Sequence, residues 1–160
     1  MNRLNRDFFT GAFNRDKFFQ DLDSALHRFS SVAMILADVD EFRKVNDTVG
    51  NQFGDSVLKE ITNVLAKRCK DSGTHGPYRF GGATFCFILE NEDKIENARL
   101  IAEALRRDVE QLRFEPHRNL LVTIRLGLSL SPADGTNSEE MVAKADSLVY
   151  LEPKRRNQVL

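Results

Sequence analysis

Hydrophobic positions recur every three or four residues after Asn14, and this spacing predicts a helix over residues 15–28 with Asn14 as its N-cap. A short continuous apolar run, Val32 to Ala37, follows and predicts a strand that is buried on both faces. The run ends in the acidic triplet Asp38-Val39-Asp40. The polar stretch from Asn46 to Asp55 then separates a short helical turn from a second long helix.

The second half of the chain alternates in the same way. Two β-favouring runs flank Gly81-Gly82, which is typical of a hairpin because both turn residues can take positive φ. Apolar positions at helical spacing predict a third long helix over residues 95–112 and a fourth that ends before Pro153. A strand is predicted between them over residues 120–130, and Val159-Leu160 is a candidate for a short last strand.

This order of elements (helix, strand, helix, hairpin, helix, strand, helix) predicts the fold class. Strands that alternate with helices and include one antiparallel hairpin indicate an α/β (α+β) domain with a mixed central sheet of about five strands. Helices are expected to flank this sheet in a ferredoxin-like arrangement. A length of 160 residues fits a single domain over residues 1–160.

Composition excludes several classes of protein. The formal net charge is −1, from 23 Lys and Arg against 24 Asp and Glu, so the chain as a whole has no electrostatic preference for nucleic acid or for a membrane surface. No apolar run approaches the roughly 20 residues of a membrane span, and the polar N-terminal segment does not resemble a secretion signal. Cys69 and Cys86 make no disulfide framework; as small core residues they fit a reducing, cytoplasmic compartment.

Candidate chemistry lies where strands end, because backbone groups are free there. Asp38 and Asp40 are two residues apart at the end of the apolar strand, so both carboxylates can point to one face and hold a hard cation such as Mg²⁺. The same carboxylates would also simply favour the N-terminus of the following helical turn. Gly81-Gly82 can bring the backbone close to a ligand or merely form the hairpin, and residues 50–55 can be a plain loop before a helix.

Familiar nucleotide and zinc motifs are missing from the sequence. There is no phosphate loop with Gly-Lys-Ser/Thr and no Gly-x-Gly-x-x-Gly. There is also no His-Glu-x-x-His and no Cys-x-x-Cys, so a structural zinc site is not expected.

Several spaced segments nevertheless follow one pattern. Asp7 to Arg15 resembles Asp-x-Leu-Thr-Gly-Leu-x-Asn-Arg, and Asp38 to Asp47 resembles Asp-x-Asp-x-Phe-Lys-x-Ile-Asn-Asp. Residues 79–85 read Arg-Phe-Gly-Gly-Ala-Thr-Phe, and Ala145-Asp146 with Val149-Tyr150 match Ala-Asp-x-x-x-Tyr. In this order the segments resemble the GGDEF domain of bacterial diguanylate cyclases over nearly the whole chain. The resemblance implies the GGDEF fold, which is similar to the palm of nucleotidyl cyclases.

The family condenses two GTP into cyclic di-GMP, with one GTP usually held by each of two facing domains. By resemblance, Asn46 and Asp55 contact the guanine base. Asp38 and the Val39 carbonyl are implied to hold Mg²⁺ in the same site.

Contacts to the phosphates are implied at the start of one helix and near the C-terminus. Phe42 and Arg43 approach the phosphates through backbone amides, and Arg43 also through its charge, where the family commonly has Lys. By resemblance, Arg156 contacts the phosphates, and Lys154 takes the place of a family Lys that is displaced in this sequence. This basic cluster can equally be a solvated surface. Gly81-Gly82 completes the implied substrate site.

The signature departs from the family at two positions. The third residue of Gly-Gly-(Asp/Glu)-Glu-Phe is assigned to the attacking 3′-hydroxyl, and the fourth helps to bind metal; here they are Ala83 and Thr84. Ala83 cannot take a proton, and the neutral hydroxyl of Thr84 is a poor ligand for a hard cation. We therefore expect no catalytic residue at these positions and weakened Mg²⁺ binding. Loss of a general base alone typically lowers the rate by about 10²–10⁴.

We therefore expect a catalytically degenerate GGDEF domain that serves as a regulatory or interaction module and can bind GTP without turnover. Two alternatives stay open. One is an active diguanylate cyclase with an unusual carboxylate arrangement, and the other is a purely structural domain for dimerisation or partner docking. Such domains are usually joined to sensory or phosphodiesterase modules, so we expect a longer multidomain protein, partner domains of that kind and a homodimer, without contact to nucleic acid or membrane.

Overall fold

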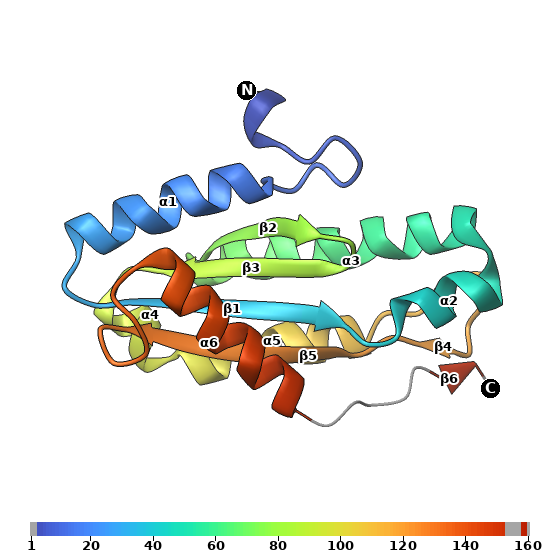
Figure 1. The fold of residues 1–160 in the computed structure, drawn as a ribbon. Helices are drawn as coiled ribbons and strands as arrows, with labels where there is room; N and C mark the ends of the chain where they lie inside the picture. Colours follow the sequence, from blue (N-terminus) through green and yellow to red (C-terminus); the bar gives the residue numbers. More distant parts are fainter. Residues whose placement is uncertain (1–2, 153–157, 160) are drawn as a thin grey trace.

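A four-stranded antiparallel sheet lies at the centre of the computed structural model, which describes residues 3–152 and 158–159 (Figure 1). The strands in spatial order are β2 (His75–Gly81), β3 (Thr84–Leu89), β1 (Val32–Val39) and β5 (Ile124–Ser131). Two short strands, β4 (Leu120–Leu121) and β6 (Gln158–Val159), pair separately. The helices are η1 (Arg3–Asn5), α1 (Arg15–Arg28), α2 (Phe42–Val49), α3 (Asn51–Ser72), α4 (Glu92–Glu96), α5 (Ala98–Glu110) and α6 (Ser138–Leu151).

The α+β class and the ferredoxin-like arrangement are confirmed, but the sheet is antiparallel rather than mixed and has four strands rather than about five. The reason is the strand order. Strands β1 and β2 run in the same direction, yet β3 lies between them; β1 in turn separates β3 from β5. Strands joined by a helical crossover are therefore never neighbours. The predicted strand over residues 120–130 is broken, and its first part leaves the main sheet as β4.

Each face of the sheet is covered by its own helices. Figure 1 shows α6 in front of the sheet and α3 and α5 behind it. The alternation along β1 explains this, because Met34 and Leu36 pack with the apolar face of α1 and α6 while Ile35 and Ala37 pack with α3 and α5. Strand β1 is thus buried on both faces, as its continuous apolar run predicts.

Element boundaries follow the sequence where local signals are strong. Helix α1 has the predicted bounds, and the Asn14 side chain accepts a hydrogen bond from the Lys17 amide at 2.9 Å. The interpretation of residues 46–55 as a polar loop is wrong: α2 and α3 fill this stretch and only Gly50, at φ 88°, separates them. The third predicted helix is interrupted at Asn97, which divides it into α4 and α5.

Both cysteines are buried and free, as expected of core residues. Burial raises the pKa of the Cys69 thiol to about 12 and that of Cys86 further still. Among the described residues, every helix is too short or too polar to span a bilayer.

Candidate functional site

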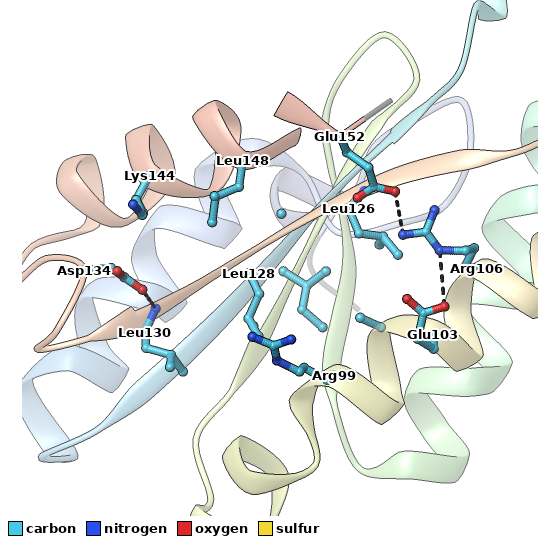
Figure 2. Close-up of a pocket in the computed structure, with 13 residues that line it drawn as sticks. Arg99, Glu103, Arg106, Leu126, Leu128, Leu130, Asp134, Lys144, Leu148 and Glu152 are labelled. Carbon is cyan, nitrogen blue, oxygen red and sulfur yellow. Dashed lines mark hydrogen bonds and ion pairs between the residues drawn. The ribbon is translucent and has the colours of Figure 1, made fainter. Parts of the chain in front are cut away.

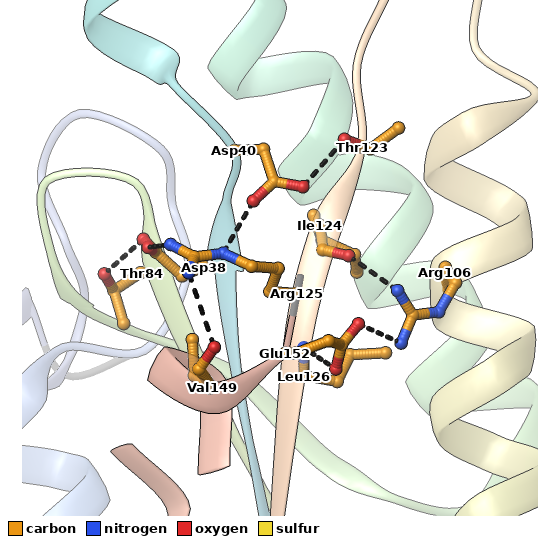
Figure 3. Close-up of polar contacts among 10 residues, drawn as sticks. All are labelled: Asp38, Asp40, Thr84, Arg106, Thr123, Ile124, Arg125, Leu126, Val149 and Glu152. Carbon is orange, nitrogen blue, oxygen red and sulfur yellow. Dashed lines mark hydrogen bonds and ion pairs between the residues drawn. The ribbon is translucent and has the colours of Figure 1, made fainter. Parts of the chain in front are cut away.

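At the acidic end of β1, three side chains on neighbouring strands lie side by side across the sheet. Asp38 is paired in register with Thr84 on β3 and with Arg125 on β5. Residues directly opposite one another on neighbouring strands point to the same face, so the three side chains meet. Thr84 Oγ1 donates to Asp38 Oδ1 at 3.1 Å, and Arg125 Nη2 donates to Asp38 Oδ2 at 3.3 Å (Figure 3). Both carboxylate oxygens of Asp38 are therefore engaged by side chains of the domain itself.

Asp40 is held by the same guanidinium. Its side chain is fully buried, and Asp40 Oδ1 accepts a hydrogen bond from Arg125 Nε at 2.7 Å. Thr123 Oγ1 donates to Asp40 Oδ2 at 2.8 Å. The third nitrogen of the guanidinium, Arg125 Nη1, donates to the Val149 carbonyl at the end of α6 at 3.4 Å. Arg125 thus joins both acidic residues of the triplet to α6 (Figure 3).

The environment of Asp38 disfavours its charge despite this pairing. Burial raises the pKa of the Asp38 carboxyl above its ordinary value, and the neighbouring carboxylates of Asp40 and Asp146 act in the same direction. The hydrogen bond from Thr84 and the charge of Arg125 act in the opposite direction but do not cancel the effect. Arg125 therefore offsets only part of the cost of keeping Asp38 charged.

The hairpin tip brings Ala83 and Thr84 to the end of β1. Gly82 has a φ of 52°, a left-handed conformation that favours glycine, and it allows the tight connection from β2 to β3. Ala83 is half-buried against the core, and its carbonyl accepts a hydrogen bond from the Val39 amide at 3.0 Å. The hairpin tip therefore lies next to the acidic triplet, and its side chains there are the methyl group of Ala83 and the hydroxyl of Thr84.

Hydrogen bonds from Arg79, which is itself held by Asp7, support the hairpin tip. Arg79 Nε donates to the Gly82 carbonyl at 2.9 Å, and Arg79 Nη1 donates to Asp7 at 3.1 Å. Asp7 also accepts from the amide and hydroxyl of Thr10. Burial opposes the effect, but these hydrogen bonds and the charge of Arg79 hold the pKa of Asp7 below its ordinary value. Asp7 and Arg79 are thus positioning residues for the hairpin.

The N-terminus of α2 follows directly on the acidic triplet. Glu41 precedes it with a φ of 49°, an uncommon conformation for a residue other than glycine, and its side chain makes no hydrogen bond that caps the helix. Phe42 and Arg43 are the first two helical residues, and the Arg43 side chain is exposed. Amides at a helix N-terminus attract anions, so this end of α2 is suited to a phosphate group.

Asn46 and Asp55, the two residues implied to contact the base, lie where α2 packs on α3. Asn46 rests on Gly54: a Cβ built at Gly54 would lie 1.7 Å from Asn46 Oδ1. Asn46 Oδ1 is buried and is among the described side-chain atoms that lack a hydrogen-bond partner. Asp55, next to Gly54, is exposed. The junction thus offers one unpaired acceptor and one solvated carboxylate.

The residues present do not fit a divalent cation as they stand. The oxygens of Asp38 and Asp40 are taken by Arg125 and two threonines. Within the described ranges, no group of three or more His, Cys, Asp or Glu side chains is arranged to hold a metal ion. The Mg²⁺ ligand role of Asp38 and Val39 therefore stays a prediction from resemblance.

The implied site residues fall into three groups. Asp38, Val39 and the hairpin glycines Gly81 and Gly82 lie together at the end of β1, with Phe42 and Arg43 directly after them. Asn46 and Asp55 lie along the α2–α3 junction. Lys154 and Arg156 lie outside the described residues. Sequence reasoning missed Arg125; a charged residue inside the apolar run of β5 is a signal for a buried ion pair.

Two of the pockets among the described residues bear on where the site lies. A pocket of about 410 Å³ between α1 and α6 borders the site, lined by Arg15, Phe80, Thr84 and Asp146 among others. A larger one of about 630 Å³ lies between α5, β5 and α6 and contains none of the implied site residues (Figure 2). Arg106 bridges Glu103 and Glu152 across its rim. We therefore assign the site to the end of β1 and not to the larger pocket.

Comparison with known proteins shows the family to which this chain belongs. The chain matches the family described as "Diguanylate cyclase, GGDEF domain" over residues 4–158, and it belongs to that family. It is 32% identical over 160 residues to diguanylate cyclase VdcA of Vibrio cholerae, covering 96% of this chain and 46% of the relative. It is 34% identical over 151 residues to the response regulator PleD of Caulobacter vibrioides, covering 90% and 33%.

Solved structures agree with this assignment. A sensory box/GGDEF family protein from Caulobacter crescentus superposes with a TM-score of 0.77 at 30% identity, covering 91% of this chain and 96% of that one. The chain spans less than half the length of the curated relatives named above.

Proposed function

We propose that this chain is a catalytically degenerate GGDEF domain in bacterial cyclic di-GMP signalling, which acts as a regulatory or interaction module and binds GTP without turning it over. The observation that carries the proposal is the hairpin tip. Ala83 and Thr84 stand at the two signature positions, and the Thr84 hydroxyl donates to Asp38 instead of offering a carboxylate.

The chemistry of phosphodiester formation explains why these positions matter. Attack by a 3′-hydroxyl needs a group that takes its proton, and the Ala83 methyl cannot do so. Loss of such a base costs about 10²–10⁴ in rate. In an active enzyme, a metal ion that binds the phosphates stabilises the transition state by several kcal/mol more. Mg²⁺ binding is weakened here because Thr84 is a poor ligand. The two losses together support negligible turnover.

Recognition of the nucleotide does not depend on the hairpin tip. The amide group of Asn46 and the exposed carboxylate of Asp55 are suited to the polar edge of a guanine base, once the Asn46 side chain turns from Gly54 toward the ligand. The N-terminus of α2, with Arg43 exposed on it, is suited to the phosphates. These features support GTP as the ligand of a domain that has lost turnover.

The setting of the domain is part of the proposal. A chain that spans under half of its relatives suggests one module of a longer protein. We propose that sensory or phosphodiesterase modules are its partners, that two copies can pair as a homodimer, and that the protein works in the cytoplasm. The two free thiols fit a reducing compartment.

The test is incubation of the purified chain with GTP and Mg²⁺ or Mn²⁺, with chromatographic detection of cyclic di-GMP. We expect none above background, while GTP binds in calorimetry. Asn46→Ala and Asp55→Ala should each weaken that binding about tenfold or more, whereas the exposed controls Asp47→Ala and Glu60→Ala should leave it unchanged.

Two results would contradict the proposal. Product formation at ordinary rates would identify an active cyclase. Complete absence of GTP binding, with no effect of Asn46→Ala or Asp55→Ala on partner association, would favour a purely structural docking domain.

A further inference from the structure

The guanidinium of Arg125 lies at the point on which the acidic residues of the site converge. It reaches Asp38 from β5 across one strand pair and Asp40 at the end of the same strand β1. Three of its nitrogens are engaged, by the two carboxylates and by the Val149 carbonyl. Only 9% of the Arg125 residue surface is exposed. Its contacts fix this cation in position (Figure 3), and its low exposure shows that it is largely shielded from water.

A divalent cation and this guanidinium compete for the same oxygens. Mg²⁺ requires oxygen ligands at about 2.0–2.1 Å in octahedral geometry, and it gives up its own water reluctantly. Asp38 has one oxygen on Arg125 and the other on Thr84, and Asp40 has one oxygen on Arg125 and the other on Thr123. An ion that entered would have to displace the guanidinium, which would then stay buried beside it as a like charge.

Arg125 also neutralises the two carboxylates, as a bound metal ion would. Two carboxylates that close together repel each other and need a positive group between them. Arg125 supplies that group from within the chain, as a metal ion would supply it from solution. The Arg125–Asp40 pair is buried, so solvent ions screen it little, whereas Asp38 is partly exposed.

We propose that Arg125 takes the place of the divalent cation at Asp38 and Asp40, so that this domain carries its own cation and binds the phosphates of its nucleotide without a metal. The first part stands on the geometry of the acidic triplet alone. The second part rests on the proposed function, since it needs GTP to be the ligand.

The first test measures metal uptake by the full chain, with Mn²⁺ titrated and free Mn²⁺ followed by electron paramagnetic resonance. We expect no saturable site in the wild-type protein up to millimolar Mn²⁺. Arg125→Gln, which removes the charge but keeps a polar side chain, should gain one site per chain with a dissociation constant at least about tenfold below the highest Mn²⁺ concentration titrated. Addition of Asp38→Asn to Arg125→Gln should abolish the gained site.

A matched control tests whether the effect is local. Arg68 forms a two-point ion pair with Asp108 between α3 and α5, at 2.7 and 3.0 Å. Arg68→Gln removes the same charge from a single carboxylate, and we expect it to leave Mn²⁺ uptake as in the wild type.

Three metal-binding results would overturn the first part. They are a wild-type Mn²⁺ site that Asp38→Asn removes, a folded Arg125→Gln protein that gains no site, and equal gains in Arg125→Gln and Arg68→Gln. The wild-type and Asp38→Asn measurements decide the question even if Arg125→Gln does not fold.

The second test compares GTP binding by the wild-type chain in excess EDTA and in millimolar Mg²⁺. We expect the two affinities to agree within about threefold. A clear requirement for Mg²⁺ would overturn the metal-free part while leaving the proposed function intact. Failure to bind GTP under both conditions would instead contradict the GTP-binding part of the proposed function, and the Mn²⁺ experiment would still decide the role of Arg125.

Discussion

The two sides of the site differ in how far their polar groups are satisfied. At the α2–α3 junction, Asn46 Oδ1 is buried without a partner and the start of α2 has no side-chain cap. Across the sheet, by contrast, every carboxylate oxygen of Asp38 and Asp40 accepts a hydrogen bond from the chain itself. A buried polar group without a partner costs stability, so the first side carries an unmet hydrogen-bonding demand that the second side does not.

Under the proposed function, recognition of the nucleotide and the altered signature positions therefore belong to separate elements of the fold. The features suited to guanine and phosphate lie on two helices, whereas the altered chemistry lies on strands β1, β3 and β5. Substitutions on the strands can therefore remove turnover without disturbing the helical junction. Each prediction below changes one side and asks whether the other responds.

The largest expected effect concerns turnover. Ala83→Asp with Thr84→Glu restores the two signature carboxylates, but we expect this double variant to stay inactive because Arg125 still occupies Asp38. Addition of Arg125→Ser should then raise the rate of cyclic di-GMP formation by at least about 100-fold over the double variant. The measurement is product formed from GTP and Mn²⁺ over time.

Arg125→Ser alone is the control for this experiment, and it should remain inactive because the tip still lacks both carboxylates. If the double variant turned over GTP as fast as the triple variant, Arg125 would not be the obstacle. GTP affinity should change little in the double variant, which keeps both Arg125 and the α2–α3 junction.

The second prediction changes the helical side. Gly54→Ala places a Cβ 1.7 Å from Asn46 Oδ1 and 2.9 Å from its Cγ, so Asn46 must move. We expect a loss of about 1–3 kcal/mol in the free energy of unfolding, measured with urea, together with loss of GTP binding. The additional change Asn46→Ala should recover much of the stability, because it removes the atoms that clash, but not the binding.

The exposed residue Asn63 on the same helix provides a control. Asn63→Ala should leave stability within about 0.5 kcal/mol and GTP binding unchanged. Equal losses in Gly54→Ala and in the double variant would show that contact with Asn46 is not the cause.

Local signals in the sequence predict what is local in the structure. The N-cap at Asn14, the buried strand β1 and the Gly81-Gly82 hairpin all appear as expected, because each depends on a few neighbouring residues. The division of residues 46–55 into two helices was missed because polar residues on an exposed helix surface have the composition of a loop. The class of fold was predictable, and the strand directions were not.

The candidate site, too, could be predicted from the sequence only in its local parts. The acidic triplet and the altered signature are visible in the sequence, but the partner of Asp38 is not, because Arg125 lies 87 residues away and reaches it only through the register of β1 with β5. No short motif encodes that register. The pattern around Arg125 indicates a strand, and only the sheet order shows which acidic residues it meets.

The smallest expected effect concerns the support of the hairpin tip. The pKa of Asp7 in the folded chain lies below its ordinary value of 3.8. Its charge therefore stabilises the fold fully at pH values above 3.8, and this contribution is lost as the pH falls through the folded-state pKa. Asp7→Asn removes it. We expect the free energy of unfolding at neutral pH to drop by about 1 kcal/mol and its dependence on pH below 4 to become flatter, as measured by urea unfolding at a series of pH values.

The exposed residue Asp23 on α1 serves as the matched control, since Asp23→Asn should leave both the stability and its pH dependence as they are in the wild type. Asp7 acts through Arg79 on the Gly82 carbonyl, which belongs to the strand side of the site. GTP affinity should therefore be the same in Asp7→Asn and the wild type. A parallel fall in GTP affinity and stability would mean that the hairpin and the helical junction are coupled, and that the two sides of the site are not independent.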